Sequence, residues 1–246
     1  QNVFMGGADL AFAGKGKFLA QHGYDERYGR TEWIGRGETE LGEWGLYDDR
    51  LLQLAKARLD ELSATGRPFN LTLLTLDTHH PSGFINRTCR ALGVKDFEGI
   101  LECNSRLLAD FIEYYKKRGY DKDSDLVILG DHLAMKNDLY EKLAKAEQSR
   151  TIFIKFHSSL YQATNRQKAY QFSVFPTLLA MLGFTFPSQG LALGLSGFGD
   201  ISKARFFPYL EEDFDAKLQA PSDIYRFFWA NTAKHGTAGT SNAVGR

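Results

Sequence analysis

The sequence predicts an α/β fold in which a mostly parallel sheet carries helices on both faces. Short apolar runs that are typical of buried strands alternate along the chain with amphipathic segments of helical period. This βαβ alternation continues without an internal repeat or an interdomain linker, which favours a parallel sheet over a sandwich or a helix bundle. With 246 residues, the chain is long enough to bury a substantial core.

The predicted strands share a high content of apolar and β-branched residues, and they cover residues 2–5, 69–76, 126–129 and 151–156. The predicted helices share apolar residues at a spacing of three or four, and they cover residues 14–22, 48–64, 97–118, 138–146 and 173–182. Gly23 and Gly66 are expected to end the first two helices. Ser173 is the expected N-cap of the last one, with Pro176 in its first turn.

Three segments show no clear period. Residues 25–45 are rich in Gly, Arg and Glu and are expected to form a long surface excursion. Residues 224–232 are expected to form a short aromatic helix or strand, and the small, polar residues 233–246 a flexible tail. We expect residues 1–232 to form a single domain. The chain begins in a strand without an initiator Met, so we expect an upstream part that carries membrane or targeting segments.

Composition excludes several classes of protein. The 30 basic and 30 acidic residues balance, so the chain lacks the electrostatic footprint of a nucleic-acid-binding protein. Aromatic residues make up 13% of the chain, which argues against disorder. No apolar run reaches the roughly 18 residues that a membrane-spanning helix needs.

Cys89 and Cys103 could close a disulfide in an oxidising compartment or remain two separate buried thiols, and the spacing alone supports both interpretations.

The most informative stretch is a predicted strand that ends in two potential metal ligands. The apolar run over residues 126–129 is followed by Gly130, Asp131 and His132. Ligands of open α/β sheets bind beyond the carboxyl ends of the strands. A carboxylate beside an imidazole suits Zn, Mn or Fe better than Ca. Asp131 and His132 are therefore candidate metal ligands, although Asp-His pairs are also common outside metal sites.

A second predicted strand ends in a similar way. Residues 69–76 run into Asp77, His79 and His80, and Pro81 then closes the strand. If both strands belong to one sheet, their ends would place these side chains around the same crevice as the Asp-His pair. The alternative interpretation is a hydrogen-bonded turn with solvent-exposed imidazoles.

Three motifs can be compared with known families. They are Gly-Gly-Ala-Asp-Leu-Ala-Phe-Ala-Gly-Lys, which ends at Lys15, Leu-Thr-Leu-Asp-Thr-His-His-Pro, which ends at Pro81, and Asp-His-Leu-Ala-Met, which starts at Asp131. Together they resemble the bacterial phosphoglycerol transferases that decorate periplasmic glucans. These enzymes belong with the lipoteichoic acid synthases in the alkaline phosphatase superfamily, which also contains the sulfatases. The resemblance covers most of residues 1–200.

The resemblance implies an alkaline phosphatase/sulfatase-like α/β domain of which this chain is the C-terminal portion, with the N-terminal strands missing. It implies a divalent metal, Mn²⁺ in the first place and Mg²⁺ or Zn²⁺ as alternatives, held by Asp131, His132 and an upstream Glu and Thr. His79 is then the expected catalytic histidine, which contacts the phosphoryl group or assists proton transfer. The expected substrate-binding residues are Lys15, His79 and His80.

The implied reaction is transfer of phosphoglycerol from phosphatidylglycerol to periplasmic glucans through a phospho-threonine intermediate. It would take place at the periplasmic face of the bacterial inner membrane, with membrane association through segments outside this chain. The nucleophilic Thr is expected upstream of Gln1, because Thr78, beside the expected site, occupies a position that the family does not use for the nucleophile.

The sequence leaves two alternative functions open. The first is a phosphodiesterase or sulfatase-type hydrolase of the same superfamily, in which Asp77, His80 and His157 could hold a second metal. The second is a non-catalytic glucan-binding module. Trp33 and Trp44 could offer aromatic surface to a glucan, although packing of the excursion onto the body is the favoured interpretation. A structural role is likewise favoured for His157.

Overall fold

The computed structural model describes residues 1–145, 154–157, 170–186, 190–198 and 213–223. The chain divides into two compact units, residues 1–159 and 160–246, which we describe separately. The segment predicted over residues 224–232 and the predicted tail over 233–246 lie outside the described residues. The single domain predicted over residues 1–232 stays a prediction.

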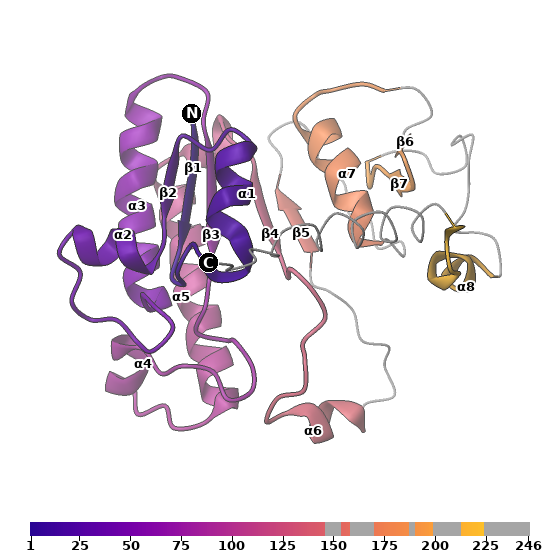
Figure 1. Ribbon diagram of the computed structural model, residues 1–246. Helices are drawn as coiled ribbons and strands as arrows, with labels where there is room; N and C mark the ends of the chain where they lie inside the picture. Colours follow the sequence, from indigo (N-terminus) through magenta and orange to yellow (C-terminus); the bar gives the residue numbers. More distant parts are fainter. Residues whose placement is uncertain (146–153, 158–169, 187–189, 199–212, 224–246) are drawn as a thin grey trace, which may run out of the picture. The chain divides into compact units, whose positions relative to one another are not determined.

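A three-stranded parallel sheet forms the centre of the first unit (Figure 1). Its strands are β1 (Asn2–Gly6), β2 (Glu26–Tyr28) and β3 (Asn70–Leu74). The strand order is β2-β1-β3, so the first strand lies between the other two. Val3 pairs with Glu26 on one side and with Leu71 on the other. The apolar character of β1 agrees with its central place in the sheet, where Val3, Phe4 and Met5 are buried.

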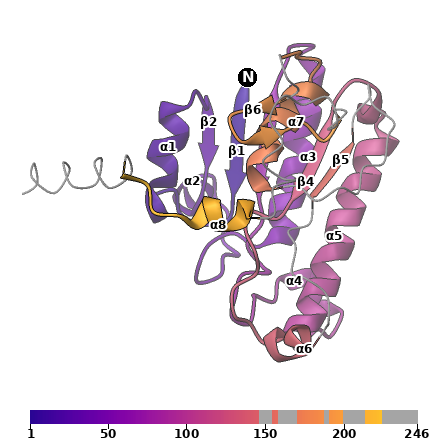
Figure 2. The same cartoon turned by 90° about the vertical axis from the view of Figure 1, so that its right-hand side faces the viewer.

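Helices cover both faces of this sheet, as the sequence predicts. The helical elements of the first unit are η1 (Phe12–Gly14), α1 (Lys15–Gln21), α2 (Arg30–Gly35), α3 (Asp48–Ala64), α4 (Arg87–Ala91), α5 (Phe97–Lys117), η2 (Tyr120–Lys122) and α6 (Tyr140–Ala144). Figure 2 shows α1 on one side of the strands and α3 with α5 on the other. The glycines expected to stop α1 and α3, Gly23 and Gly66, both have positive φ angles.

The core follows from the alternation of side chains along β1. Val3 and Met5 point to one face, where they join a cluster of buried residues from α3 and α5. Phe4 points to the opposite face, where it is buried and the ammonium group of Lys15 lies 5.9 Å from its ring centroid. The helical members of the cluster are Trp33 of α2, with Leu51, Leu52, Ala55, Leu59, Leu62, Phe111 and Tyr115 of α3 and α5.

The prediction of an irregular surface excursion over residues 25–45 is wrong in its first half, which forms β2 and α2. Trp33 of α2 is buried, and its indole N–H donates a hydrogen bond to the carbonyl oxygen of Gly6 over 2.8 Å. Its ring stacks on that of Tyr28. The favoured interpretation of Trp33 as a packing residue is therefore confirmed.

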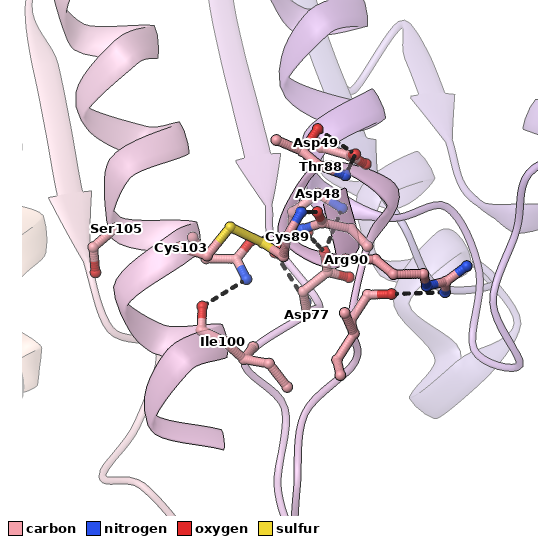
Figure 3. Close-up of a disulfide and its surroundings, with 12 residues drawn as sticks. Asp48, Asp49, Asp77, Thr88, Cys89, Arg90, Ile100, Cys103 and Ser105 are labelled. Carbon is pink, nitrogen blue, oxygen red and sulfur yellow. Dashed lines mark hydrogen bonds between the residues drawn. A yellow bond between two sulfur atoms is a disulfide. The ribbon is translucent and has the colours of Figure 1, made fainter. Parts of the chain in front are cut away.

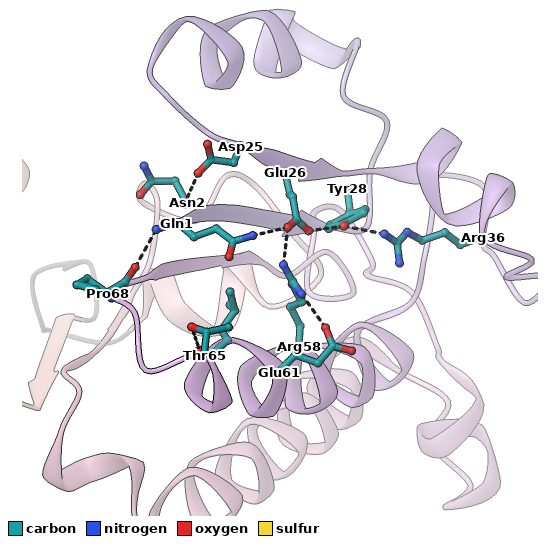
Figure 4. Close-up of polar contacts among 11 residues, drawn as sticks. Gln1, Asn2, Asp25, Glu26, Tyr28, Arg36, Arg58, Glu61, Thr65 and Pro68 are labelled. Carbon is teal, nitrogen blue, oxygen red and sulfur yellow. Dashed lines mark hydrogen bonds and ion pairs between the residues drawn. The ribbon is translucent and has the colours of Figure 1, made fainter.

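Polar contacts explain why β2 lacks the apolar pattern of a strand. Glu26 accepts hydrogen bonds from the side chains of Gln1 and Tyr28 and forms an ion pair with Arg58 of α3 (Figure 4). Arg36 in turn donates to the Tyr28 hydroxyl. Because these bonds cross from one element to another, β2 is held at the edge of the sheet by charge and hydrogen bonding.

The first unit also contains an antiparallel strand pair, β4 (Leu126–Leu129) with β5 (Ile154–His157). The sequence predicts both strands, although residues 151–153 of the second lie outside the described residues. His157 lies opposite Leu126 in the register, at the end of β5. The segment that follows β4 leads to α6, within the helix predicted over residues 138–146.

The second unit contains η3 (Gln171–Ser173), α7 (Val174–Met181), β6 (Gly190–Leu191), β7 (Gly194–Leu195) and α8 (Phe214–Gln219). Pro176 lies in the first turn of α7 and Ser173 at its N-cap, as predicted, but the Ser173 side chain makes no capping hydrogen bond. Ser173 is part of a 3-10 turn that continues into α7, and its hydroxyl accepts a hydrogen bond from the backbone N–H of Leu195. Tertiary contact with β7 thus replaces the local cap.

Within the part of the chain that the structure describes, no helix combines the length and the apolar character needed to cross a membrane.

A disulfide between Cys89 and Cys103 joins α4 to α5 (Figure 3). Both cysteines are buried, and the bond closes a loop with a sequence separation of 14 residues. Of the two interpretations left open by the sequence, the structure selects the disulfide. The bond ties the loop that follows β3 to the long helix beneath it.

We expect the double variant Cys89→Ala/Cys103→Ala to lose about 3 kcal/mol of unfolding free energy, because the closed loop restricts the unfolded chain. Urea denaturation of the full-length protein measures this loss. A reductant should lower the stability of the unmodified protein by a similar amount and leave the double variant unchanged. Equal stability of both proteins without reductant would contradict the expected contribution.

Candidate active site

The predicted substrate-binding residues lie on loops at one edge of the parallel sheet. Since β1 and β3 run in parallel, their carboxyl ends meet at the same edge. The chain passes from β1 through η1 to Lys15, the first residue of α1. From β3 it passes directly to His79 and His80. The structure thus places all three residues on connections that leave this edge.

His79 is held by its own loop. Its backbone N–H donates to the carbonyl oxygen of Leu76, and its carbonyl oxygen accepts from the N–H of Gly83, both over 2.9 Å. The ring nitrogen Nδ1 lies 2.8 Å from the carbonyl oxygen of His80. A carbonyl oxygen only accepts, so Nδ1 carries the proton, and Nε2 is the unprotonated nitrogen of the neutral ring. A half-buried imidazole with a fixed tautomer is suited to proton transfer.

Trp44 lies against His79, a contact between two loops that are distant in sequence. The centroids of the two rings are 4.4 Å apart, and the His80 ring stacks on His79 at 4.5 Å. The sequence singles out Trp44 only as part of the excursion. Its place beside His79 depends on a tertiary contact, so no local signal predicts it.

Two glycines bring the Trp44 loop to this edge. The backbone N–H of Leu46 donates to the carbonyl oxygen of Gly7 over 3.1 Å, and Ala8 forms a β-bridge with Gly45. A Cβ atom at Gly45 would lie 1.9 Å from the carbonyl oxygen of Gly7, and the φ of Gly45 is +151°. The absence of a side chain at Gly45 therefore allows the loop to touch the end of β1.

Lys15 supplies positive charge at the same edge. Burial lowers the pKa of its ammonium group, and the nearby Asp9 carboxylate opposes that shift. Asp9 itself accepts hydrogen bonds from the backbone N–H of Ala11 and from the hydroxyl of Thr31. These contacts make Asp9 a residue that orders the loop after β1, and substrate binding by Lys15 stays a prediction.

Asp131 and His132 lie beside each other on the segment after β4. The carboxylate Oδ2 of Asp131 and the ring Nε2 of His132 are 3.6 Å apart, and both side chains are exposed. The Nδ1 of His132 donates to the carbonyl oxygen of Leu133 over 2.8 Å, which directs the lone pair of the neutral ring to Nε2. Two donors that each bind a metal at about 2.1 Å lie ~3.0–3.4 Å apart. The observed separation of 3.6 Å is longer than this range, so the role of the pair as metal ligands stays a prediction.

Among the described residues, no group of three or more His, Cys, Asp and Glu side chains is arranged to hold a metal. The metal-ligand role of Asp131 and His132 therefore stays a prediction. The predicted segments after β3 and β4 do approach each other, because the backbone N–H of Asp138 donates to the carbonyl oxygen of Pro81 over 3.1 Å.

The expectation that Asp77 lines this crevice is wrong. Asp77 is fully buried, and its Oδ2 accepts hydrogen bonds from the backbone N–H of Asp48 and from the side-chain amide of Asn86. Asp48 reciprocates by accepting from the backbone N–H groups of Leu76 and Asp77. Figure 3 shows both carboxyl groups near the disulfide. Asp77 therefore joins β3 to α3 and does not face substrate.

This buried pair has unusual electrostatics. Burial is the main cause that raises the pKa of Asp77, and repulsion from the Asp48 carboxylate adds to it. Burial also raises the pKa of Asp48, while its backbone hydrogen bonds oppose the shift. The Oδ1 of Asp77 has no hydrogen-bond partner among the described residues. A proton on this oxygen relieves the repulsion between the two carboxyl groups.

The sequence and the fold can now be compared with known proteins. Residues 1–184 match the family model described as Sulfatase. Phosphoglycerol transferase I from Escherichia fergusonii is 36% identical over 221 residues, which is 86% of this chain and 28% of that protein. Phosphoglycerol transferase I from Escherichia coli K12 is 35% identical over the same shares. The chain thus spans less than a third of the length of these relatives.

Solved structures agree on the fold. The lipoteichoic acid synthase LtaP from Listeria monocytogenes aligns with a TM-score of 0.61 at 19% identity, covering 82% of this chain and 53% of LtaP. A protein in the alkaline phosphatase superfamily from Vibrio parahaemolyticus aligns with a TM-score of 0.60 at 19% identity, covering 83% and 50%. The predicted alkaline phosphatase/sulfatase-like α/β fold is confirmed.

We expect different results from the two buried carboxyl groups when each is changed to an amide in the full-length protein. Asp48→Asn leaves a backbone N–H of Leu76 or Asp77 without an acceptor and should cost about 1–3 kcal/mol of unfolding free energy. Asp77→Asn resembles the protonated carboxyl group and should be nearly neutral at pH 7. Urea denaturation measures both values, and an equal loss in the two variants would contradict the proton assignment.

The same pair predicts a pH dependence. A raised carboxyl pKa means that the folded state binds the proton more tightly than the unfolded state, so stability falls as pH rises between the ordinary value of 3.8 and about 8. Asp77→Asn should flatten this fall, which thermal denaturation between these pH values would detect. An unchanged slope would show that Asp77 does not titrate in this range.

A third expectation concerns the loop that carries Trp44. Gly45→Ala should cost roughly 1–3 kcal/mol more than Gly37→Ala, because the new methyl group would collide with the backbone of Gly7. Gly37 is the matched control, since it also has a positive φ but open space around its Cβ position. Thermal denaturation of both variants compares them, and equal losses would argue against the close approach.

Proposed function

This chain belongs to the sulfatase family, and from that premise we propose that the full-length protein transfers phosphoglycerol from phosphatidylglycerol to a periplasmic glucan. The observation that carries the proposal is the likeness to phosphoglycerol transferase I over 86% of this chain. The fold supports the same reaction class, because the phosphate-compatible Lys15 and the tautomer-fixed His79 lie on loops from one sheet edge.

Asp131 and His132 are proposed to hold a divalent metal, most simply Mn²⁺, together with a Glu and a Thr from residues upstream of Gln1. When bound, the metal would neutralise charge on the phosphoryl oxygens and lower the pKa of the nucleophilic hydroxyl. His132 would bind through Nε2, because Nδ1 donates to the carbonyl oxygen of Leu133. The two donor atoms are 3.6 Å apart, and because both side chains are exposed, a small rotation would bring them to the ~3.0–3.4 Å that a shared ion requires.

The proposed reaction consists of two displacements. In the first, the upstream Thr oxygen loses its proton and bonds to phosphorus, the ester bond to diacylglycerol breaks, and the departing oxygen takes up a proton. In the second, a glucan hydroxyl oxygen loses its proton and bonds to phosphorus, and the displaced Thr oxygen takes up a proton. His79 is the proposed proton carrier in both steps, because its unprotonated Nε2 can accept the proton of the attacking hydroxyl and then donate it to the departing oxygen.

Lys15 and His80 are proposed to bind the substrate. The partly buried ammonium group of Lys15 would pair with a phosphoryl oxygen, since a cation in a partly desolvated site interacts more strongly with phosphate than one in bulk water. His80 stacks on His79 and would contact the same headgroup. This reaction places the protein at the periplasmic face of the inner membrane, where the lipid donor and the glucan meet.

The test uses the full-length protein, phosphatidylglycerol vesicles labelled in the glycerol headgroup, and a short β-glucan oligosaccharide. The unmodified protein should release diacylglycerol and label the oligosaccharide, and a chelator should abolish both until Mn²⁺ is restored. Asp131→Ala and His132→Ala should lose bound metal and activity. His79→Gln should keep its metal and lose on the order of 10²–10⁴ in rate.

His22→Ala is the matched control. His22 also directs Nδ1 to a backbone carbonyl, that of Phe18, but it is exposed at the end of α1. The His22→Ala variant should keep both its bound metal and its transferase activity. Full activity in Asp131→Ala and His132→Ala would refute the metal site, and label released only as free glycerol phosphate would identify a hydrolase.

A further inference from the structure

A cluster of aromatic rings continues outward from His79 at the site edge. We call Phe12, Trp44, His79, His80 and Phe84 the aromatic platform. The ring centroid of Trp44 lies 4.4 Å from His79, 5.7 Å from Phe12 and 6.1 Å from Phe84. Trp44 is thus the central member, in contact with one ring from η1 and two rings from the loop after β3.

The platform lies outside the hydrophobic core. The side chain of Phe12 is 59% exposed, and Trp44 is half-buried. None of the five residues belongs to the buried cluster around β1, α3 and α5 or packs against it as a partly buried member. A large aromatic surface that remains accessible beside a proton-transfer residue needs an explanation other than core packing.

Trp33 and Trp44 show the contrast within one segment. The indole N–H of Trp33 donates to the carbonyl oxygen of Gly6, as a buried Trp requires. The indole N–H of Trp44 donates to no residue that the structure describes. Trp44 therefore combines an apolar ring with an available hydrogen-bond donor.

This combination matches the chemistry of a sugar. A pyranose ring has a face of C–H groups that packs on an aromatic ring and a rim of hydroxyl groups that need hydrogen-bond partners. The Trp44 ring offers the first contact, and its N–H with the neighbouring imidazoles offers the second. An acyl chain would use the rings but would leave these polar groups without partners.

The position of the platform agrees with the chemistry of an acceptor. A sugar packed on Trp44 would extend toward His79, whose ring lies 4.4 Å from the indole. A hydroxyl group of that sugar would then be close to Nε2, the nitrogen that can accept its proton. The tight approach of Gly45 to Gly7 holds Trp44 in this place before any ligand binds.

We propose that Trp44, with Phe12 at its edge, is the stacking site for a glucose ring of the acceptor glucan and presents a hydroxyl group of that ring to His79. This assignment deepens the proposed function and rests on it for the identity of the acceptor. It makes Trp44 a binding residue for the second substrate, distinct from the residues that meet the phosphate.

The test compares Trp44→Ala and Phe12→Ala with the unmodified full-length protein. Two readouts are used: the KM for a short β-glucan oligosaccharide at fixed phosphatidylglycerol, and the affinity for the same oligosaccharide measured by NMR titration without lipid. Phe12→Ala is included because removal of a largely exposed ring should not disturb folding. The control is Phe18→Ala, which removes an equally exposed ring that stacks on His22 at 4.0 Å.

Both platform variants should raise the KM for the oligosaccharide and weaken its direct binding, by on the order of tenfold for Trp44→Ala, while the KM for phosphatidylglycerol changes less. Trp44→Tyr should restore part of the affinity, and Phe18→Ala should change neither value. Unchanged oligosaccharide affinity in Trp44→Ala would overturn the assignment. A larger rise in the KM for phosphatidylglycerol would also overturn it and assign the platform to the donor.

The binding titration separates this assignment from the proposed function. If the protein transfers no phosphoglycerol but binds the oligosaccharide through Trp44, the proposed function fails and the platform stands. If transfer proceeds with a normal KM in Trp44→Ala, the platform fails and the proposed function stands. If the unmodified protein does not bind the oligosaccharide in the titration, the platform fails regardless of activity.

Discussion

The reciprocal hydrogen bonding between Asp48 and Asp77 is the constraint on which the site depends. Each buried carboxyl group accepts from the backbone at the other's position, so the first residue of α3 and the end of β3 cannot move independently. Asn86 extends the connection, because it donates to Asp77 and accepts from the N–H of Cys89. The disulfide between Cys89 and Cys103 then links this hydrogen-bond network to α5. The loop with His79 is therefore anchored at both ends.

In this anchored loop, Asp77 and His79 have different surroundings although they are two residues apart. The Asp77 carboxyl group is buried and bonded in the interior, whereas His79, two residues later, uses Nδ1 for its loop and leaves Nε2 outside that hydrogen bond. His132 follows the same rule after β4. The rule is not a signature by itself, since His22 obeys it on the surface of α1. What distinguishes His79 is that it follows a strand of the parallel sheet, at the edge where an open α/β sheet binds its ligands. His132 follows β4, which belongs to a separate antiparallel pair with β5.

Backbone proximity has an equally direct effect on the aromatic residues. Trp33 and Trp44 belong to one segment of the sequence, yet one completes the core and the other faces the site edge. Trp33 lies on a helix that packs against the sheet, so its ring is buried. Trp44 precedes a glycine that touches the end of β1, so its ring is carried past the core to His79. The difference arises from one close contact between two loops.

Much of this protein was determined by local patterns. The apolar runs and helical periods predict β1, β3, β4, α3 and α5 closely, because burial on one face imposes a period that the sequence must show. The His-His motif predicts side chains at the carboxyl edge of the sheet, and the structure places His79 and His80 on the connection that leaves this edge. By contrast, β2 has no apolar period, because polar bonds through Glu26 hold it at the edge of the sheet.

The tertiary structure alone decided three further features. It placed Asp77 inside instead of at the crevice, because Asp48, 29 residues away, supplies its partner. It chose the disulfide from two open interpretations of the cysteines. It brought Trp44 to His79 through a contact between Gly45 and Gly7. In each case the deciding group is distant in sequence, and a pairing across such a distance leaves no periodic trace in the chain.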